Sequence, residues 1–187
     1  MFKLLFEKKI EQHHLLRRIY PESVNTIRID TLRCVSGKLV MSGALLRVGK
    51  GGRKVDNWSG PQGGIAIAID LEKGCLNRGG YDYFLNEYPS HPDSGFSFDN
   101  TIIPFWKELL GVVRQTANLF PQANSIGWDI AITEKGPIII EANTDYGITS
   151  LQTTNGPYLK KRDFINALNE HIGISKYKKR YEKYFVV

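Results

Sequence analysis

The sequence has little cysteine and no long apolar run. Its 187 residues include two cysteines, Cys34 and Cys75, too few for a disulfide framework or a zinc cluster. Its apolar runs, such as residues 65–69, fall far short of the roughly 18 residues that suggest a membrane span. The start has too short an apolar stretch for a secretory signal. These absences argue against a disulfide-rich secreted domain and a transmembrane segment, and they predict a cytoplasmic location.

The positive charge is concentrated toward the chain ends. The net charge is +6, and residues 160–187 carry eight basic and three acidic residues. A basic terminal stretch binds nucleic acid or anionic lipid in some proteins, whereas in most it is the solvated face of a packed helix. No zinc finger, RNA-recognition or helix-turn-helix signature is present. We therefore expect no nucleic-acid partner, and a basic binding module remains the weakest interpretation.

The hydrophobic pattern predicts one α+β domain over residues 1–187, built on a mostly antiparallel sheet. A helix is inserted before the last hairpin, and basic helices lie within residues 159–187. The run Ile138-Ile139-Ile140 is typical of a strand that is buried on both faces. The predicted strands span residues 4–10, 23–35, 39–48, 65–71, 75–84, 126–133 and 137–142. The predicted helices span residues 11–20, 104–120, 159–172 and 175–185, and loops span 49–64, 85–100 and 143–157.

The final hairpin carries the most informative polar residues. A tight turn at residues 135–136 places Asp129 nearly opposite Glu141 and Asn143, and these last two share one face of their strand. Three oxygen donors that include two carboxylates suit Mg²⁺. A carboxylate directly after three isoleucines is costly unless it is paired or metal-bound. The alternative is that the strand has reached the surface at Glu141.

The motifs together resemble the ATP-grasp superfamily. The segment Gly-Trp-Asp-Ile, followed by Gly-Pro-Ile-Ile-Ile-Glu-Ala-Asn-Thr-Asp-Tyr-Gly, is similar to the metal-binding hairpin near the C-terminus of that fold. Residues 23–29, Leu46-Arg47-Val48-Gly49 with Val55-Asp56-Asn57, and His91-Pro92-Asp93-Ser94-Gly95 resemble the sugar-transfer-associated type more narrowly. The resemblance extends from about residue 6 to residue 152.

The resemblance implies an ATP-dependent ligase that joins a carboxylate to an amine through an acylphosphate, with small-molecule substrates. Its subfamily suggests a role in polysaccharide or cell-surface sugar synthesis. Asp129, Glu141 and Asn143 resemble the Mg²⁺ ligands of that family. Arg28 and Arg47, each in the middle of a predicted strand, would bind phosphate or acylphosphate oxygens, because a guanidinium matches such anions. Alternatively, each arginine forms a structural ion pair with Asp30, Asp56 or Asp129.

The glycine-rich loop at residues 49–64 lacks the Walker A pattern. Backbone amides of such a loop can close over phosphates or over an acceptor substrate. Asn57, within this loop, is a candidate contact to ATP. The competing interpretation is a long hairpin connection.

Residues 6–10 resemble the hinge of ATP-grasp proteins, whose backbone pairs with adenine. Glu7, Lys9 and Ile10 would line the base, and Gln12 or His13 would approach the ribose. A surface strand explains the same residues. If the segment is the hinge, the small N-terminal subdomain lies elsewhere, and a partner chain could supply it. A truncated or degenerate half that does not turn over alone is therefore the second hypothesis for this chain.

Overall fold

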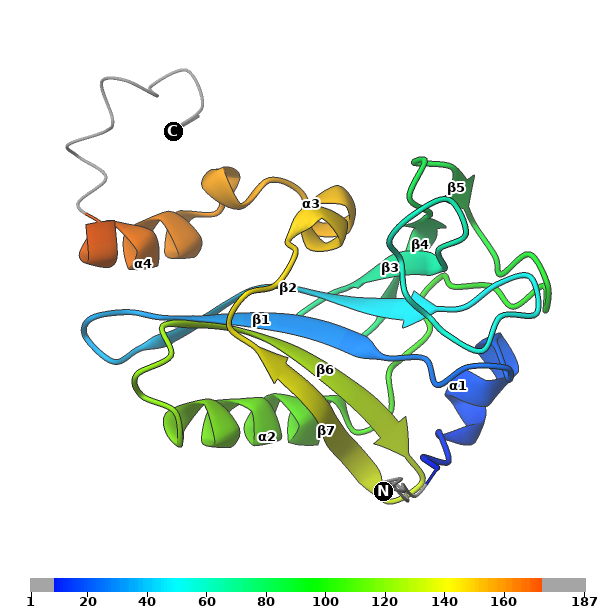
Figure 1. Ribbon diagram of the computed structural model, residues 1–187, viewed down its shortest axis with the longest axis horizontal. Helices are drawn as coiled ribbons and strands as arrows, with labels where there is room; N and C mark the ends of the chain where they lie inside the picture. Colours follow the sequence, from blue (N-terminus) through cyan, green and yellow to red (C-terminus); the bar gives the residue numbers. More distant parts are fainter. Residues whose placement is uncertain (1–8, 173–187) are drawn as a thin grey trace, which may run out of the picture.

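The computed structural model describes residues 9–172 and contains one antiparallel sheet of seven strands (Figure 1). The strands lie side by side in the order β5-β4-β3-β2-β1-β6-β7. The α+β class and the antiparallel sheet are confirmed. The strand predicted at residues 4–10 lies almost wholly outside the described residues, and the helix predicted at 175–185 lies entirely outside them. The strands are β1 (Ile27–Arg33), β2 (Leu39–Val48), β3 (Ile65–Ile69), β4 (Leu76–Tyr81), β5 (Glu87–Tyr88), β6 (Ser125–Thr133) and β7 (Gly136–Asn143).

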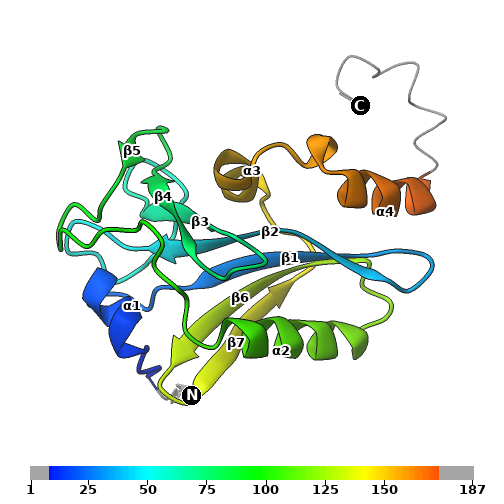
Figure 2. The same ribbon diagram turned by 180° about the vertical axis from the view of Figure 1, so that it is seen from behind.

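The main hydrophobic core lies on one face of the sheet, under helix α2 (Trp106–Asn118). The buried residues of α2 are Trp106, Leu109, Val113 and Ala117, a spacing that keeps them on one side of a helix. The core extends to Leu16 of the short helix α1 (His14–Ile19). Figure 2 shows α2 lying along β6 and β7, with α1 at one end of the sheet.

The opposite face is covered in part by three short helical segments, α3 (Thr149–Asn155), η1 (Tyr158–Lys160) and α4 (Arg162–Ile172) (Figure 1). Leu151 and Tyr158 pack against Leu45 and Ala66 there. The loop prediction for residues 143–157 was wrong over α3. The helix predicted at 159–172 is divided in two, because Lys161 is extended.

The two edges of the sheet are β5 and β7. Within β7, Ile138 and Ile140 are about half exposed, so the prediction of a strand buried on both faces was wrong. A run of isoleucines fits an edge strand equally well, since only Ile139 packs against the core. Ile140 is the extra residue of a β-bulge, because the pairing moves from Asp129–Glu141 to Ile130–Ile139.

Within residues 9–172, no helix combines the length and the apolar composition needed to cross a bilayer. The longest described helix, α2, has 13 residues. This agrees with the absence of a long apolar run in the sequence.

Candidate active site

The register of three adjacent strands brings the predicted charged residues into one row. Arg28 of β1 pairs with Asp129 of β6, and Asp129 pairs with Glu141 of β7. Directly opposed residues of antiparallel strands point to the same face. Asn143 pairs with Gly127 two positions further along, so it shares that face. The row lies on the α3 side of the sheet, because the alternating neighbours of these residues, such as Trp128, belong to the core on the α2 side.

Two arginines hold the Asp129 carboxylate. Arg28 donates from Nε to Oδ1 at 2.7 Å and from Nη2 to Oδ2 at 2.8 Å, a bidentate pair. Arg47 Nη2 lies 3.0 Å from Oδ1. The Asp129 side chain is only 6% exposed. Arg28 and Arg47 therefore form ion pairs with Asp129, which was the alternative interpretation of these two arginines.

Asp56 belongs to the same network, although we did not predict it as a site residue. Its Oδ2 accepts hydrogen bonds from the Thr26 amide at 2.8 Å and from the Thr26 hydroxyl. That hydroxyl in turn accepts from Arg47 Nε and Nη2 at 3.0 and 2.7 Å. Burial raises the pKa of the Asp56 carboxyl, although Arg47 and Thr26 act in the opposite direction. Asp56 and Thr26 thus orient Arg47 toward Asp129. The sequence signal was the placement of Asp56 directly before Asn57 in the family-like segment.

Glu141 and Asn143 are the accessible members of the row. Glu141 is exposed and Asn143 is half-buried. Neither side chain hydrogen-bonds to another residue between positions 9 and 172. Asp129 accepts two hydrogen bonds from Arg28 and forms an ion pair with Arg47 through Oδ1, which leaves one lone pair of Oδ2. Two carboxylates and an amide oxygen form the hard donor set that Mg²⁺ prefers, so these residues fit that ion.

Tyr146 fixes the segment that follows β7. Its hydroxyl lies 2.6 Å from Ser125 Oγ, and its ring lies over Gly127. A Cβ at position 127 would be 2.6 Å from Tyr146 Cγ, closer than real contacts. The glycine therefore makes room for the ring, and the ring positions the chain next to Asn143.

The loop of residues 49–64 is anchored at several points. The indole of Trp58 donates to the Tyr81 carbonyl at 2.7 Å, and the Gly51 amide donates to Asp93 at 2.6 Å. Asn57 is exposed, and its side chain accepts from the Ser59 amide at 3.2 Å. The loop thus presents Asp56 to the site, and its role toward a ligand stays a prediction.

The hinge-like segment is described only in part. Glu7 lies outside the described residues. Lys9 is exposed and Ile10 is half-buried. Gln12 is buried, and its amide makes four hydrogen bonds, to the carbonyls of Tyr20 and Ser23 and from the backbone and side chain of Asn25. Every hydrogen-bonding position of Gln12 is thereby used within the chain, an arrangement typical of a structural residue.

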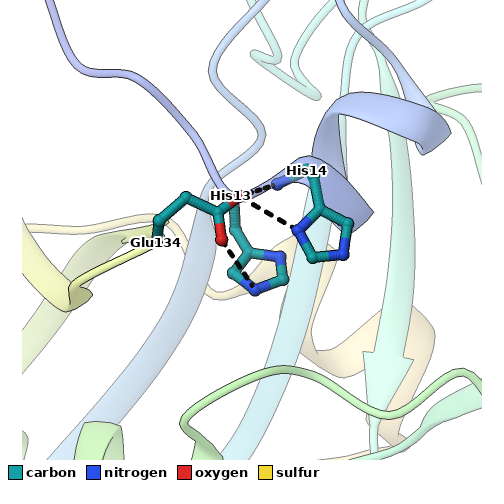
Figure 3. Close-up of side chains that lie close together, drawn as sticks. All are labelled: His13, His14 and Glu134. Carbon is teal, nitrogen blue, oxygen red and sulfur yellow. Dashed lines mark hydrogen bonds and ion pairs between the residues drawn. The ribbon is translucent and has the colours of Figure 1, made fainter.

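One histidine-containing cluster has the composition of a metal site (Figure 3). Glu134 lies 3.0 Å from His14 Nδ1 and 3.5 Å from His13 Nε2. However, His13 Nδ1 accepts the Leu15 amide at 3.1 Å and caps α1, so Nε2 carries the proton. A metal at Nε2 would require a doubly deprotonated imidazole. The cluster therefore links the β6–β7 turn to α1 through hydrogen bonds.

His91, in the family-like segment His-Pro-Asp, is fully buried and ties two loops together. Its Nε2 lies 2.7 Å from the Gly49 carbonyl, and its Nδ1 accepts from the Asp93 amide at 3.2 Å. The ring stacks on Tyr20 at 5.1 Å. These contacts account for His91 without a ligand.

Comparison with known proteins identifies the family. Searches of curated proteins and of solved structures return no significant match. The sequence profile described as sugar-transfer associated ATP-grasp matches residues 2–169, most of the chain. The chain therefore belongs to the sugar-transfer associated ATP-grasp family.

Proposed function

We propose that the chain binds ATP together with Mg²⁺ on the α3 side of β1, β2, β6 and β7, and that it uses ATP to join a carboxylate to an amine. Family membership supports this proposal. The observation that carries it is the register that aligns Arg28, Asp129 and Glu141 across three neighbouring strands. The substrates we propose are small molecules of polysaccharide or cell-surface sugar synthesis.

Glu141, Asn143 and the remaining lone pair of Asp129 would hold Mg²⁺. When bound, the ion neutralises negative charge on the phosphate oxygens of ATP. Glu141 and Asn143 are accessible, so an incoming ion meets them without rearrangement of the core. Asp129 contributes one oxygen while the arginines keep its orientation fixed.

Arg28 and Arg47 would bind the phosphoryl oxygens. A carboxylate oxygen of the substrate attacks the γ-phosphorus, the bond to the bridging oxygen breaks, and ADP leaves. The amine then attacks the carbonyl carbon of the acylphosphate, phosphate leaves, and an amide remains after the amine loses a proton to solvent. The guanidinium groups stabilise the charge on the transferring group. Both arginines would do so through N–H groups that do not face Asp129, and Asp56, through Thr26, keeps Arg47 in place.

The test is calorimetric titration of the full chain with ATP, with and without Mg²⁺. We expect binding that depends on Mg²⁺ and that is lost in Glu141→Ala and in Asn143→Ala. Each of these side chains can be shortened without opening the core, because Glu141 is exposed and Asn143 is half-buried on the edge strand.

The matched control is Glu72→Ala, in the exposed turn after β3, which should bind as the unaltered chain does. Equal binding in Glu141→Ala would contradict the assignment of the ion. Binding without turnover would favour the second hypothesis, in which a partner chain completes the site.

A further inference from the structure

The two arginines that hold Asp129 occupy a carboxylate of the candidate metal site. Arg28 contacts both oxygens of Asp129, from Nε at 2.7 Å and from Nη2 at 2.8 Å. Arg47 Nη2 lies 3.0 Å from Oδ1. A divalent ion that approaches Asp129 therefore meets two positive charges beside one negative charge.

These positive charges are permanent and weakly screened. The guanidinium group of arginine stays protonated throughout the physiological pH range. The side chains of Arg28, Arg47 and Asp129 are only 11%, 16% and 6% exposed, so little water lies between the charges. The repulsion between a guanidinium and a divalent ion on the same carboxylate is therefore strong.

Arg28 carries the larger part of this effect. Asp56 lies 3.7 Å from Arg47 Nε and offsets part of the Arg47 charge. Among residues 9–172, Asp129 is the only carboxylate within 4 Å of Arg28. The charge of Glu141 also acts on Arg28. Arg28 thus opposes a free cation at both carboxylates of the proposed metal site.

The triphosphate of ATP reverses this balance. Mg²⁺ usually binds through one or two carboxylates together with phosphate oxygens of a substrate, rather than in a site built by protein alone. Phosphate oxygens would accept from the guanidinium N–H groups that do not face Asp129, and so offset their charge. They would also supply ligands that the row of Asp129, Glu141 and Asn143 lacks.

We propose that Arg28 is a specificity-determining residue of this site, because its charge prevents Asp129 and Glu141 from binding a free divalent ion. The site then accepts the ion together with ATP and rejects it alone. This inference rests on the proposed function, since it takes the ion and ATP to share one site. Arg47 acts in the same direction with a smaller effect.

The experiment measures the binding of Mn²⁺ to the full chain without nucleotide, by electron paramagnetic resonance of the free ion. Mn²⁺ takes the same oxygen ligands as Mg²⁺. We expect Arg28→Gln to bind Mn²⁺ at least about tenfold more tightly than the unaltered chain, because a repelling charge and two hydrogen bonds to Asp129 are removed. The same variant should bind ATP with Mg²⁺ more weakly, so the two affinities change in opposite directions.

Three further variants serve as controls. Arg28→Lys keeps the charge and should bind Mn²⁺ as the unaltered chain does. Arg78→Gln removes an equal charge from a 91% exposed side chain on β4, and it should also leave Mn²⁺ binding unchanged. The double variant Arg28→Gln/Glu141→Ala should lose the gain, which locates the ion at this row.

Arg47→Gln keeps the test independent of how well Arg28→Gln folds, because Arg28 then still pairs with Asp129. It should also bind Mn²⁺ more tightly than the unaltered chain. Equal Mn²⁺ affinity in the unaltered chain and in these two variants would overturn the proposal. An equal gain in Arg28→Lys would overturn it too, since charge would not be the cause. No nucleotide is present in this comparison, so its failure is distinct from failure of the proposed function, which the ATP titration tests.

Discussion

Asp82 accepts five hydrogen bonds from four residues, and this network makes its side chain a stabilising element of the β4–β5 hairpin. The donors are Lys50, Tyr88, the Phe84 amide and both the amide and the side chain of Asn86. Burial raises the pKa of this carboxyl, but hydrogen bonds from Lys50 and Asn86 outweigh it and hold the pKa well below its usual range.

Asp82→Asn should lower the free energy of unfolding by about 2–4 kcal/mol at pH 7, because a buried charged network loses one partner. The pKa is lower in the folded than in the unfolded chain. The ionised Asp82 carboxylate therefore contributes its full stability above its unfolded pKa of about 3.9. This contribution is lost as the pH falls toward the pKa of the folded chain. Urea unfolding measures the free energy of unfolding of Asp82→Asn and of the unaltered chain. The difference between the two should be smaller at pH 3 than at pH 7.

The control for this prediction is Asp99→Asn, whose partially exposed side chain lies 3.7 Å from Arg78 and accepts a hydrogen bond from the Asn100 side chain at 3.1 Å. It should change stability by less than about 1 kcal/mol. A difference between Asp82→Asn and the unaltered chain that is the same at both pH values would contradict the role given to the ionised carboxylate.

Gly127→Ala should weaken both the fold and the binding of ATP with Mg²⁺. The added Cβ meets the Tyr146 ring at 2.6 Å, so the ring and the chain beside Asn143 must shift, at a cost of about 1–3 kcal/mol. Thermal unfolding and calorimetric titration measure the two effects. Gly147→Ala, where nothing lies within 4 Å of a new Cβ, is the matched control. Unchanged binding in Gly127→Ala would separate Tyr146 from the proposed site.

The sequence predicted which charged residues belong to the candidate site, but it did not predict which of them form pairs. The alternation of Arg28 with buried isoleucines indicated a charge that needs a partner, and the sequence left three candidate carboxylates. Asp129 lies 101 positions from Arg28, so the choice depends on which strands are neighbours. Asp56 was missed as a site residue because its contact with Thr26 depends on how a glycine-rich loop folds back.

At the scale of elements, the sequence of the β6–β7 hairpin predicted which residues lie opposite each other but not which side chains are exposed. The turn at residues 135–136 predicted the opposition of Asp129 and Glu141, which is confirmed. The exposure of Ile138 and Ile140 was not predictable, because an apolar run does not say whether another strand follows in the sheet. Helix α3 was missed because its sequence, Thr-Ser-Leu-Gln-Thr-Thr-Asn, holds a single buried apolar residue, Leu151.

The edge strand β7 should promote self-association at high protein concentration. Its outer side pairs with no other described strand, and Ile138 and Ile140 are exposed there. Ile140→Lys should reduce association, whereas Val35→Lys, at another exposed position, should not. Size-exclusion chromatography with light scattering measures the mass. A monodisperse monomer at high concentration would count against this prediction.

At the scale of the whole molecule, the sheet order is the feature that sequence reasoning could not supply. The strands and the main helix followed from their periodicities. The central place of β1 between β2 and β6 depends on contacts between distant segments, which local patterns do not encode. The family resemblance supplied part of this information, since it predicted that the first hairpin and the last would share one site.

ATP with Mg²⁺ should stabilise the whole chain against heat. At 100 times the dissociation constant, a ligand that binds only the folded state adds about 2.7 kcal/mol. For a chain of this length, that corresponds to a rise of about 5–10 °C in Tm. Differential scanning fluorimetry should show the rise with ATP and Mg²⁺ and its loss after EDTA is added. An equal rise in EDTA would mean that the nucleotide binds without the ion.

The alternation along β1 and β6 has a consequence for how this gene can change. Arg28 stands between two core isoleucines, and Asp129 stands between Trp128 and Ile130. Inserting or deleting one codon within either strand would move the charges into the core and the core residues onto the α3 side of the sheet. Such a frame-preserving change would lower the stability of the fold and would also disrupt the row of charged residues. A change in the length of the 49–64 loop leaves the alternation along β1 and β6 intact. Natural and engineered length changes should therefore be confined to the loops.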